Sequence, residues 1–279
     1  MKIAVIGGNG FIGKHVLVEL VKKQVDVVAV DISLPQEKGT SPVKWVKMDI
    51  FNPPVNVFEH LGCPDSCIHL AWGGLPNYKS LHHFEKELPG QYNFLSTLIR
   101  GGLTSLVVSG TCFEYGIKTG ELSEDMVPCP TNPYGFAKDV LRRQLEFLRS
   151  SIPFAFSWTR LFYLYGAGQA ANSLWSQLNS AVLRGDDVFP MSGGSQIRDY
   201  LPIEIVAERL VLLANNRADI GIVNICSGRP ISVRNLVESW IIKNKWTIKL
   251  DLGRYPYPDY EPMEFWGNCS KLNTFLNLK

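Results

Sequence analysis

The sequence predicts an α/β fold, in which a doubly wound parallel sheet carries helices on both faces and a smaller lobe follows towards the C-terminus. First, residues 1–13 join a β-branched apolar run to three glycines at three-residue spacing and then to a helical pattern. Second, strand-like and helical segments alternate after this turn, as βαβ units do. Third, 279 residues with 46% hydrophobic content can bury one large core and a small lobe. Together these features predict a Rossmann-type sheet.

The glycine turn predicts the class of ligand. Such a turn bends the backbone sharply and lets it approach a phosphate, while the N-terminus of the next helix offers unpaired N–H groups and a partial positive charge. We therefore expect a dinucleotide cofactor to bind at this turn. The expected contacts are Gly7, Gly10, Phe11, Ile12 and Gly13.

An acidic residue ends the second predicted strand. Residues 25–30 read as a buried strand and are followed by Asp31, where a carboxylate can hold the hydroxyls of an adenosine ribose. An exposed loop aspartate is the alternative interpretation. Neither Ile32 nor Ser33 is the arginine that usually accommodates a 2′-phosphate. The sequence therefore favours NAD(H), and NADP(H) stays the alternative.

The third and fourth predicted strands place further cofactor contacts. Residues 44–48 lead into Asp49, which could accept from the adenine amino group or cap the next segment. Residues 66–71 run into small residues that would let the cofactor lie against the backbone. His69 in this strand is expected to be a packed core residue. The expected contacts are Asp49, Ile50, Leu70 and Ala71.

Composition excludes several other functions. The net charge of +2 and the absence of a long basic run argue against a nucleic-acid partner, and no apolar stretch reaches the ~18 residues of a membrane span. The six cysteines are scattered and match neither a redox pair nor a zinc site, so we expect reduced thiols and no metal. The first strand begins at Lys2, which leaves no room for a leader and predicts a cytoplasmic protein.

Two segments carry the predicted chemistry. The fifth strand, residues 103–109, leads to Thr111, and ligands bind at the carboxyl ends of strands in such sheets. Residues 130–140 begin a helix in which Tyr134 and Lys138 share one face. An ammonium about 4 Å from the phenol would favour the phenolate by roughly 4 kcal/mol at an effective dielectric of 20. The tyrosine could then exchange a proton with a substrate hydroxyl or carbonyl.

In this order the motifs resemble the extended short-chain dehydrogenase/reductase family, and more narrowly its nucleotide-sugar epimerases, dehydratases and reductases. The resemblance implies that Tyr134 is the proton donor or acceptor and that Thr111 binds the substrate oxygen. It also implies that Lys138 holds the nicotinamide ribose and lowers the tyrosine pKa. The matching motifs are Gly7-x-x-Gly10-x-x-Gly13, Asp31, Thr111 with Tyr115-Gly116, Tyr134-x-x-x-Lys138, residues 160–166 and Arg198-Asp199-Tyr200-Leu201.

Departures from the family pattern narrow the implied reaction. Family dehydratases carry an Asp-Glu pair directly after the threonine, where this chain has Cys112 and Phe113, so dehydration and other carbon-acid chemistry are disfavoured. An asparagine common in the preceding helix is replaced by Glu87. Glu114 is expected to be a solvated or capping carboxylate.

What remains is hydride transfer at a carbonyl. The resemblance implies NAD(P)H-dependent reduction of the 4-keto group of a nucleotide-linked 4-keto-6-deoxy sugar, in deoxysugar biosynthesis. The segments 109–116 and 189–202 are similar to those of dTDP-4-keto-6-deoxyglucose reductases. A nucleotide-sugar 4-epimerase with tightly bound NAD is one alternative. A non-catalytic dinucleotide sensor is the other, although sensors of this fold usually lack the tyrosine and lysine.

The expected domains exchange chain more than once. Residues 1–166 are expected to form the dinucleotide-binding domain, with a segment at about 199–228 returning to it. Residues 167–198 and 229–279 are expected to form the substrate-binding lobe. A nucleotide sugar is the expected substrate of that lobe.

Two contacts of these domains follow from the resemblance. Arg198 is expected to meet the nucleotide diphosphate, because a forked guanidinium matches phosphate oxygens, and an ion pair with Asp199 is the alternative. Family dimers pair the helix that bears the catalytic tyrosine, so a homodimer is expected. Leu141, Leu145 and Leu148 permit that pairing.

Overall fold

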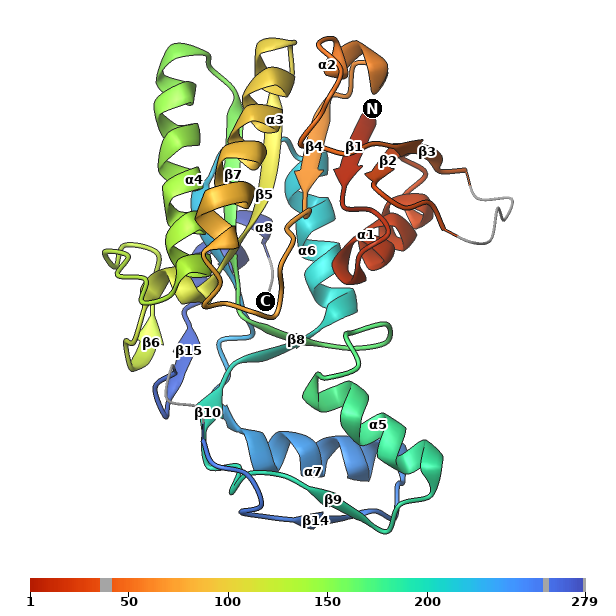
Figure 1. Ribbon diagram of the computed structural model, residues 1–279, viewed down its shortest axis with the longest axis vertical. Helices are drawn as coiled ribbons and strands as arrows, with labels where there is room; N and C mark the ends of the chain where they lie inside the picture. The colour runs from red at the N-terminus through yellow and green to blue at the C-terminus, as the bar shows by residue number, and fades with distance from the viewer. Residues whose placement is uncertain (36–41, 258–260, 278–279) are drawn as a thin grey trace.

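A seven-stranded parallel sheet forms the centre of the protein (Figure 1), which confirms the predicted fold class. The structure, a computed structural model, describes residues 1–35, 42–257 and 261–277. The strand order is β12-β7-β5-β4-β1-β2-β3, so the direction of winding reverses between β1 and β4. Ligands bind outside the carboxyl ends of the strands at such a point. The strands are β1 (Lys2–Ile6), β2 (Asp26–Asp31), β3 (Lys44–Lys47), β4 (Ser66–His69), β5 (Ser105–Thr111), β7 (Ala155–Leu161) and β12 (Gly221–Ile225).

Helices cover both faces of the sheet, and each face has its own core. In β1, Ile3 and Val5 pack into the core under α1 and α6, whereas Ala4 and Ile6 pack into the core under α3 and α4. Because both faces are buried, the strands read as continuous apolar runs. The helices of the sheet are α1 (Phe11–Lys22), α2 (Val57–His60), α3 (Leu88–Arg100), α4 (Pro133–Ser151), α6 (Ile203–Asn215) and α8 (Ser270–Leu276).

A smaller layer lies beyond the carboxyl ends of the strands, at the bottom of Figure 1. It has a separate apolar cluster that includes Leu178 on one helix and Trp240 on another. Short paired strands connect this layer to the sheet. The elements of the smaller layer and of its connections to the sheet are α5 (Leu174–Arg184), α7 (Val233–Asn244), β9 (Val188–Pro190) with β14 (Lys249–Asp251), β10 (Ile197–Arg198) with β13 (Ile231–Ser232), β8 (Tyr163–Tyr165) with β11 (Tyr200–Pro202), and β6 (Gly120–Leu122) with β15 (Phe265–Gly267).

The predicted dimer contact through the leucines of α4 is wrong. Leu141, Leu145 and Leu148 are all buried in the protomer's own core, against the sheet. The outward face of α4 carries Phe136 and Phe147 instead, with exposed fractions of 50% and 77%. Helical spacing indicated an apolar stripe, but it could not show which neighbour that stripe packs against.

Two predictions from composition can be compared with the structure. All six cysteines are free thiols, as expected from their scattered positions. Among the residues that the structure describes, no helix is both long enough and apolar enough to cross a membrane. In the same ranges, no cluster of three or more His, Cys, Asp or Glu side chains could hold a metal ion.

Candidate active site

The glycine turn after β1 leaves no room for a side chain at Gly7 or at Gly13. Gly7 has a φ of +83°, and a Cβ there would lie 2.9 Å from the backbone nitrogen of Ala71. A Cβ on Gly13 would lie 2.2 Å from the carbonyl oxygen of Gly7. The helix α1 then begins after Gly10 with no side-chain cap and no acidic residue in its first turn. Its N-terminal N–H groups therefore suit an anionic ligand such as a pyrophosphate.

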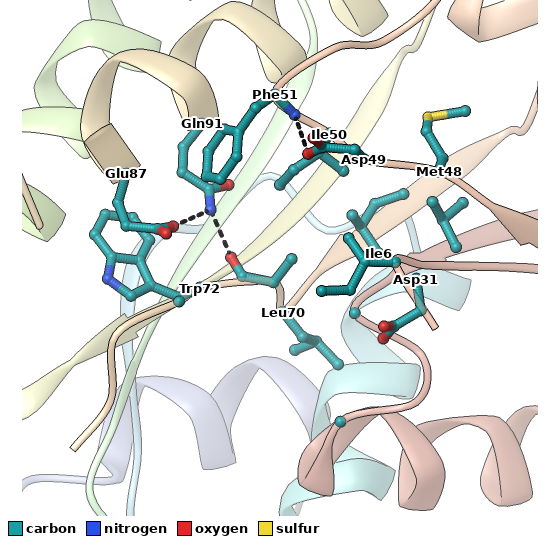
Figure 2. Close-up of a pocket in the computed structure, with 16 residues that line it drawn as sticks. Ile6, Asp31, Met48, Asp49, Ile50, Phe51, Leu70, Trp72, Glu87 and Gln91 are labelled. Atoms are coloured by element: carbon teal, nitrogen blue, oxygen red, sulfur yellow. Dashed lines mark hydrogen bonds between the residues drawn. The ribbon is translucent and has the colours of Figure 1, made fainter. Parts of the chain in front are cut away.

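A cavity of about 270 Å³ opens at this turn (Figure 2). It is lined by residues at the carboxyl ends of β1, β2, β3 and β4 and by the start of α3. Phe11 and Ile12 pack their side chains against the core instead, and Gly13 lies beneath the turn. The predicted contacts that line the cavity are Gly7, Gly10, Asp31, Asp49, Ile50, Leu70 and Ala71.

Two of the acidic residues that line this cavity, Asp31 and Asp49, are fixed by local hydrogen bonds. The carboxylate of Asp31 accepts from the backbone nitrogens of Asn9 at 3.0 Å and Ser33 at 3.2 Å. The carboxylate of Asp49 accepts from the backbone nitrogen of Phe51 at 3.0 Å and from the amide of Asn52, so its capping interpretation is confirmed. Both carboxylates line the cavity where a ribose or an adenine amino group could reach them.

The structure brings the three predicted catalytic residues together. Asn132 caps α4 by accepting from the backbone nitrogen of Gly135, which places Tyr134 in the first turn. The side chain of Thr111, at the end of β5, lies close enough to the phenol of Tyr134 to lower its pKa. One turn later, the Nζ of Lys138 donates to the carbonyl oxygen of Ser109 at 2.7 Å. Phenol, hydroxyl and ammonium therefore meet at one strand end.

The electrostatics of this group differ from the expectation that Lys138 lowers the pKa of Tyr134. Burial raises the pKa of Tyr134 well above its ordinary value, and the side chain of Thr111 opposes this only in part. Burial also lowers the pKa of Lys138 to about 7, although the carboxylates of Glu114 and Glu87 act to raise it. The ammonium is 6.0 Å from the Tyr134 ring and is directed towards Ser109, so it does not offset the desolvation of the phenol.

Replacing Lys138 by Met is expected to raise the free energy of unfolding at about pH 6. The fold lowers the lysine pKa from 10.5 to about 7, so its burial penalty is complete below pH 7 and disappears as the pH rises to 10.5. The gain should therefore be largest in acid, up to about 5 kcal/mol, and shrink in alkali. Urea unfolding of both proteins across this pH range measures it. A difference that does not change with pH would contradict the burial penalty.

Glu114 is the main functional residue whose place was not foreseen. It is fully buried, so its interpretation as a solvated carboxylate is wrong, and its capping interpretation is confirmed. Its carboxylate accepts from the backbone nitrogen of Thr111 at 2.9 Å, from Trp158 Nε1 at 2.8 Å and from Arg160 Nε at 2.8 Å. The Thr-x-x-Glu spacing of a capping box was the available signal.

Aromatic rings surround the phenol of Tyr134. Four ring centroids lie 5.3–6.3 Å from that of Tyr134, and two of these rings, Tyr78 and Phe113, lie 4.8 Å apart. No periodic pattern in the sequence predicts this cage, because its members come from a loop, a π-helix at His83–Glu87 and a 3₁₀-helix at Cys112–Tyr115. Its members are Trp72, Tyr78, His83 and Phe113.

Glu87 and His69 belong to one buried chain of hydrogen bonds beside the cavity. Glu87 accepts from His82 Nε2 at 3.1 Å. It also accepts from Gln91 Nε2 at 2.9 Å (Figure 2). His69 Nε2 donates to Gln91 Oε1 at 2.6 Å. Burial lowers the pKa of His69 to about 3, so this histidine is a neutral core residue, as predicted.

Arg198 is already engaged within the protein. Its guanidinium donates to Glu261 at 2.9 Å and to the carbonyl oxygens of Ile197 and Met263. The alternative of an ion pair with Asp199 is wrong, because that carboxylate accepts from the backbone of residues 227, 228 and 267. A diphosphate would have to share the guanidinium with Glu261. The phosphate contact stays a prediction.

Comparison with known proteins agrees with this geometry. A model described as the NAD dependent epimerase/dehydratase family matches residues 3–226. The chain is 29% identical to a dTDP-6-deoxy-L-talose 4-dehydrogenase (NAD(+)) of Aggregatibacter actinomycetemcomitans, over 96% of this chain and 99% of that protein. It is 25% identical to a UDP-glucose 4-epimerase of Lactobacillus helveticus, over 100% and 92% of the two chains.

Solved structures show the same architecture. MoeE5 in complex with UDP-glucose and NAD is 26% identical and superposes with a TM-score of 0.82, covering 99% of this chain and 92% of that one. The superposed region therefore includes both the sheet and the smaller layer. Since the family model spans most of the chain and includes the glycine turn, Thr111, Tyr134 and Lys138, the chain belongs to the NAD-dependent epimerase/dehydratase family.

Proposed function

We propose that the protein catalyses the NAD(P)H-dependent reduction of the 4-keto group of a nucleotide-linked 4-keto-6-deoxy sugar. One observation carries this proposal: Thr111 and Tyr134 meet beside a dinucleotide cavity, with no second acid or base directly after the threonine. The relative named dTDP-6-deoxy-L-talose 4-dehydrogenase (NAD(+)) supports oxidation and reduction at C4 of a 6-deoxy sugar.

The chain's own residues can perform the proton transfer. Gly7, Gly10 and Asp31 would hold the dinucleotide, which when bound supplies the hydride for the keto carbon. Burial raises the pKa of Tyr134, so the phenol is protonated at neutral pH and can protonate the developing alkoxide. The hydroxyl of Thr111 is placed to hydrogen-bond the same oxygen. A protonated phenol suits reduction better than oxidation.

The neighbours of Thr111 favour carbonyl chemistry over dehydration. Burial raises the pKa of the Cys112 thiol, so it is a poor base at neutral pH. Phe113 has no ionisable group, and its ring lies 4.8 Å from that of Tyr78. Glu114, the next carboxylate along the chain, already accepts three hydrogen bonds. None of these three neighbours is suited to transfer a proton, so we assign that role to Tyr134.

The nicotinamide preference is a separate expectation. Replacing Asp31 by Asn should improve NADPH binding relative to NADH by about 5-fold to 10³-fold, because like charges about 4 Å apart repel by about 1–4 kcal/mol. Titration of both dinucleotides into each protein measures the ratio of their Kd values. Asp49→Asn is the control, since it should affect both dinucleotides equally. An unchanged ratio in Asp31→Asn would remove this role.

A nucleotide-sugar 4-epimerase is the second candidate. The same three residues serve it, and the epimerase from Lactobacillus helveticus matches the full length of this chain. An epimerase regenerates its own cofactor, so it should retain NAD through purification. Mass spectrometry of ligands released from the purified protein, together with interconversion of 4-epimers without added dinucleotide, would favour this candidate.

We also propose that the protein is a homodimer, paired through the exposed stripe of α4 that carries Phe136 and Phe147. These rings lie three helical turns apart on one face, and Phe136 packs edge-on against Phe84. Phe147→Glu should therefore yield a monomer by light scattering. Phe275→Glu, an exposed position on α8, should leave the dimer intact. A wild-type monomer, or a Phe147→Glu dimer, would contradict the interface.

Incubation with dTDP-4-keto-6-deoxyglucose tests the reductase directly. The proposal predicts oxidation of NADH or NADPH that depends on both the protein and the sugar nucleotide. Absence of oxidation with either dinucleotide would reject that substrate.

A further inference from the structure

Trp72 stands between the dinucleotide cavity and the catalytic residues. Its side chain lines the cavity and lies next to Glu87 in Figure 2. The Nζ of Lys138 is 4.0 Å from the centroid of the Trp72 ring, which is a cation–π distance. The same ring packs edge-on against Tyr134 at 5.9 Å. The indole therefore contacts both members of the Tyr-Lys pair from the cofactor side.

A buried histidine fixes the indole in this orientation. Trp72 Nε1 donates to Nδ1 of His83 at 3.1 Å, and Nε2 of His83 donates to the carbonyl oxygen of Asn77 at 2.8 Å. An indole N–H can only donate and a carbonyl can only accept, so His83 must be neutral with its proton on Nε2. Its ring is fully buried and lies 5.3 Å from Tyr134. Trp72 thus cannot rotate without breaking a buried hydrogen bond.

The Lys138 ammonium has few other partners. Within residues 1–35, 42–257 and 261–277 it donates one hydrogen bond, to Ser109. The charged groups that face it are the carboxylates of Glu114 on the 3₁₀-helix and Glu87 on the π-helix, and both favour the ammonium. The other titratable groups facing it are His69 on β4 and Tyr134 on α4, both of which are neutral at neutral pH. Because burial opposes the charged form, the aromatic face is a substantial part of what stabilises it.

We propose that Trp72 is a positioning residue for Lys138: the indole face holds the ammonium against the carbonyl oxygen of Ser109, and His83 holds the indole. The inference rests on the proposed function in one respect, that Lys138 is the group that would hold the cofactor ribose. The contacts themselves are independent of the sugar substrate. A leucine at position 72 would fill the space but remove both the ring quadrupole and the N–H donor.

The test is to titrate Lys138 itself and to monitor the titration by NMR of protein labelled with ¹³C at lysine Cε. Lys138→Arg identifies the resonance. Trp72→Leu is expected to lower the pKa of Lys138 by about 0.4–1.5, which is the range of a cation–π contact at a partly to fully desolvated site. Trp72→Phe keeps an aromatic face and should lower it less. Trp246→Leu, in the smaller layer, is the matched control and should leave the pKa of Lys138 unchanged.

Variants of His83 test the second half of the inference. His83→Gln can accept from the indole and donate to Asn77, so it should keep the Lys138 pKa near that of the wild type. His83→Leu can do neither. It should lower the pKa of Lys138, as Trp72→Leu does. Dinucleotide affinity should fall above a certain pH, where Lys138 loses its proton. In Trp72→Leu this pH should be lower than in the wild type.

The outcomes separate this inference from the proposed function, because the titration needs neither sugar nor cofactor. A lowered Lys138 pKa in Trp72→Leu and His83→Leu supports the positioning role even if the protein reduces no sugar nucleotide. An unchanged pKa in Trp72→Leu overturns it and leaves Trp72 as packing. If Trp72→Leu does not fold, Trp72→Phe and the two His83 variants decide by the same criterion.

Discussion

Replacing Tyr134 by Phe is expected to lower kcat by about 10²–10⁴-fold, which is the usual contribution of a positioned general acid. The substitution removes one oxygen from a ring held by a cage of aromatic neighbours, so the ring should stay in place. Dinucleotide affinity should change little. Steady-state kinetics and dinucleotide titration of the same preparation measure both quantities.

Tyr92→Phe is the control for that experiment. Tyr92 lies on α3 and packs against the core, away from the catalytic group, so its loss of a hydroxyl should leave kcat unchanged. A Tyr134→Phe variant that loses less than about tenfold in kcat would show that another group transfers the proton. A variant that loses dinucleotide binding as well would point to a structural role for the hydroxyl.

Replacing Glu114 by Leu is expected to cost about 3–5 kcal/mol in the free energy of unfolding, the largest loss of stability predicted for this chain. The change leaves the Arg160 guanidinium buried without its carboxylate. It also strands two buried donors, the backbone nitrogen of Thr111 and the indole of Trp158. Urea unfolding monitored by circular dichroism gives the value.

Two further variants separate the ion pair from general packing. The double variant Glu114→Leu with Arg160→Met should recover much of the loss, because an apolar pair can replace a buried ion pair. Glu238→Gln, which removes an exposed pair with Arg234 on α7, should cost less than about 1 kcal/mol. A loss below about 1 kcal/mol for Glu114→Leu would mean that water reaches the guanidinium.

The sheet and the cofactor cavity could be predicted because their signals are local. Each central strand is an apolar run between turns, and the glycine turn has a fixed spacing from strand to helix. Predictions of this kind depend only on residues that lie near one another in the sequence.

The parts that could not be predicted depend on contacts distant in sequence. Arg198 finds its carboxylate 63 residues later, at Glu261, and the adjacent Asp199 serves other donors. The π-helix that presents His83 and Glu87 has no periodic signature in an otherwise helical pattern. Desolvation of Tyr134 is likewise a property of the packed cage, so the spacing of the Tyr-Lys pair alone gave the wrong direction for its pKa.

The most direct test of the proposed function is to reduce dTDP-4-keto-6-deoxyglucose with NADH and with NADPH, each deuterated at nicotinamide C4. Using both C4 epimers of the labelled cofactor covers transfer from either face of the ring. The proposed function predicts that the wild type forms a 6-deoxy sugar nucleotide with one deuterium at sugar C4. Tyr134→Phe should lose this reaction. A product without deuterium at C4, or no product from any labelled cofactor, would contradict it.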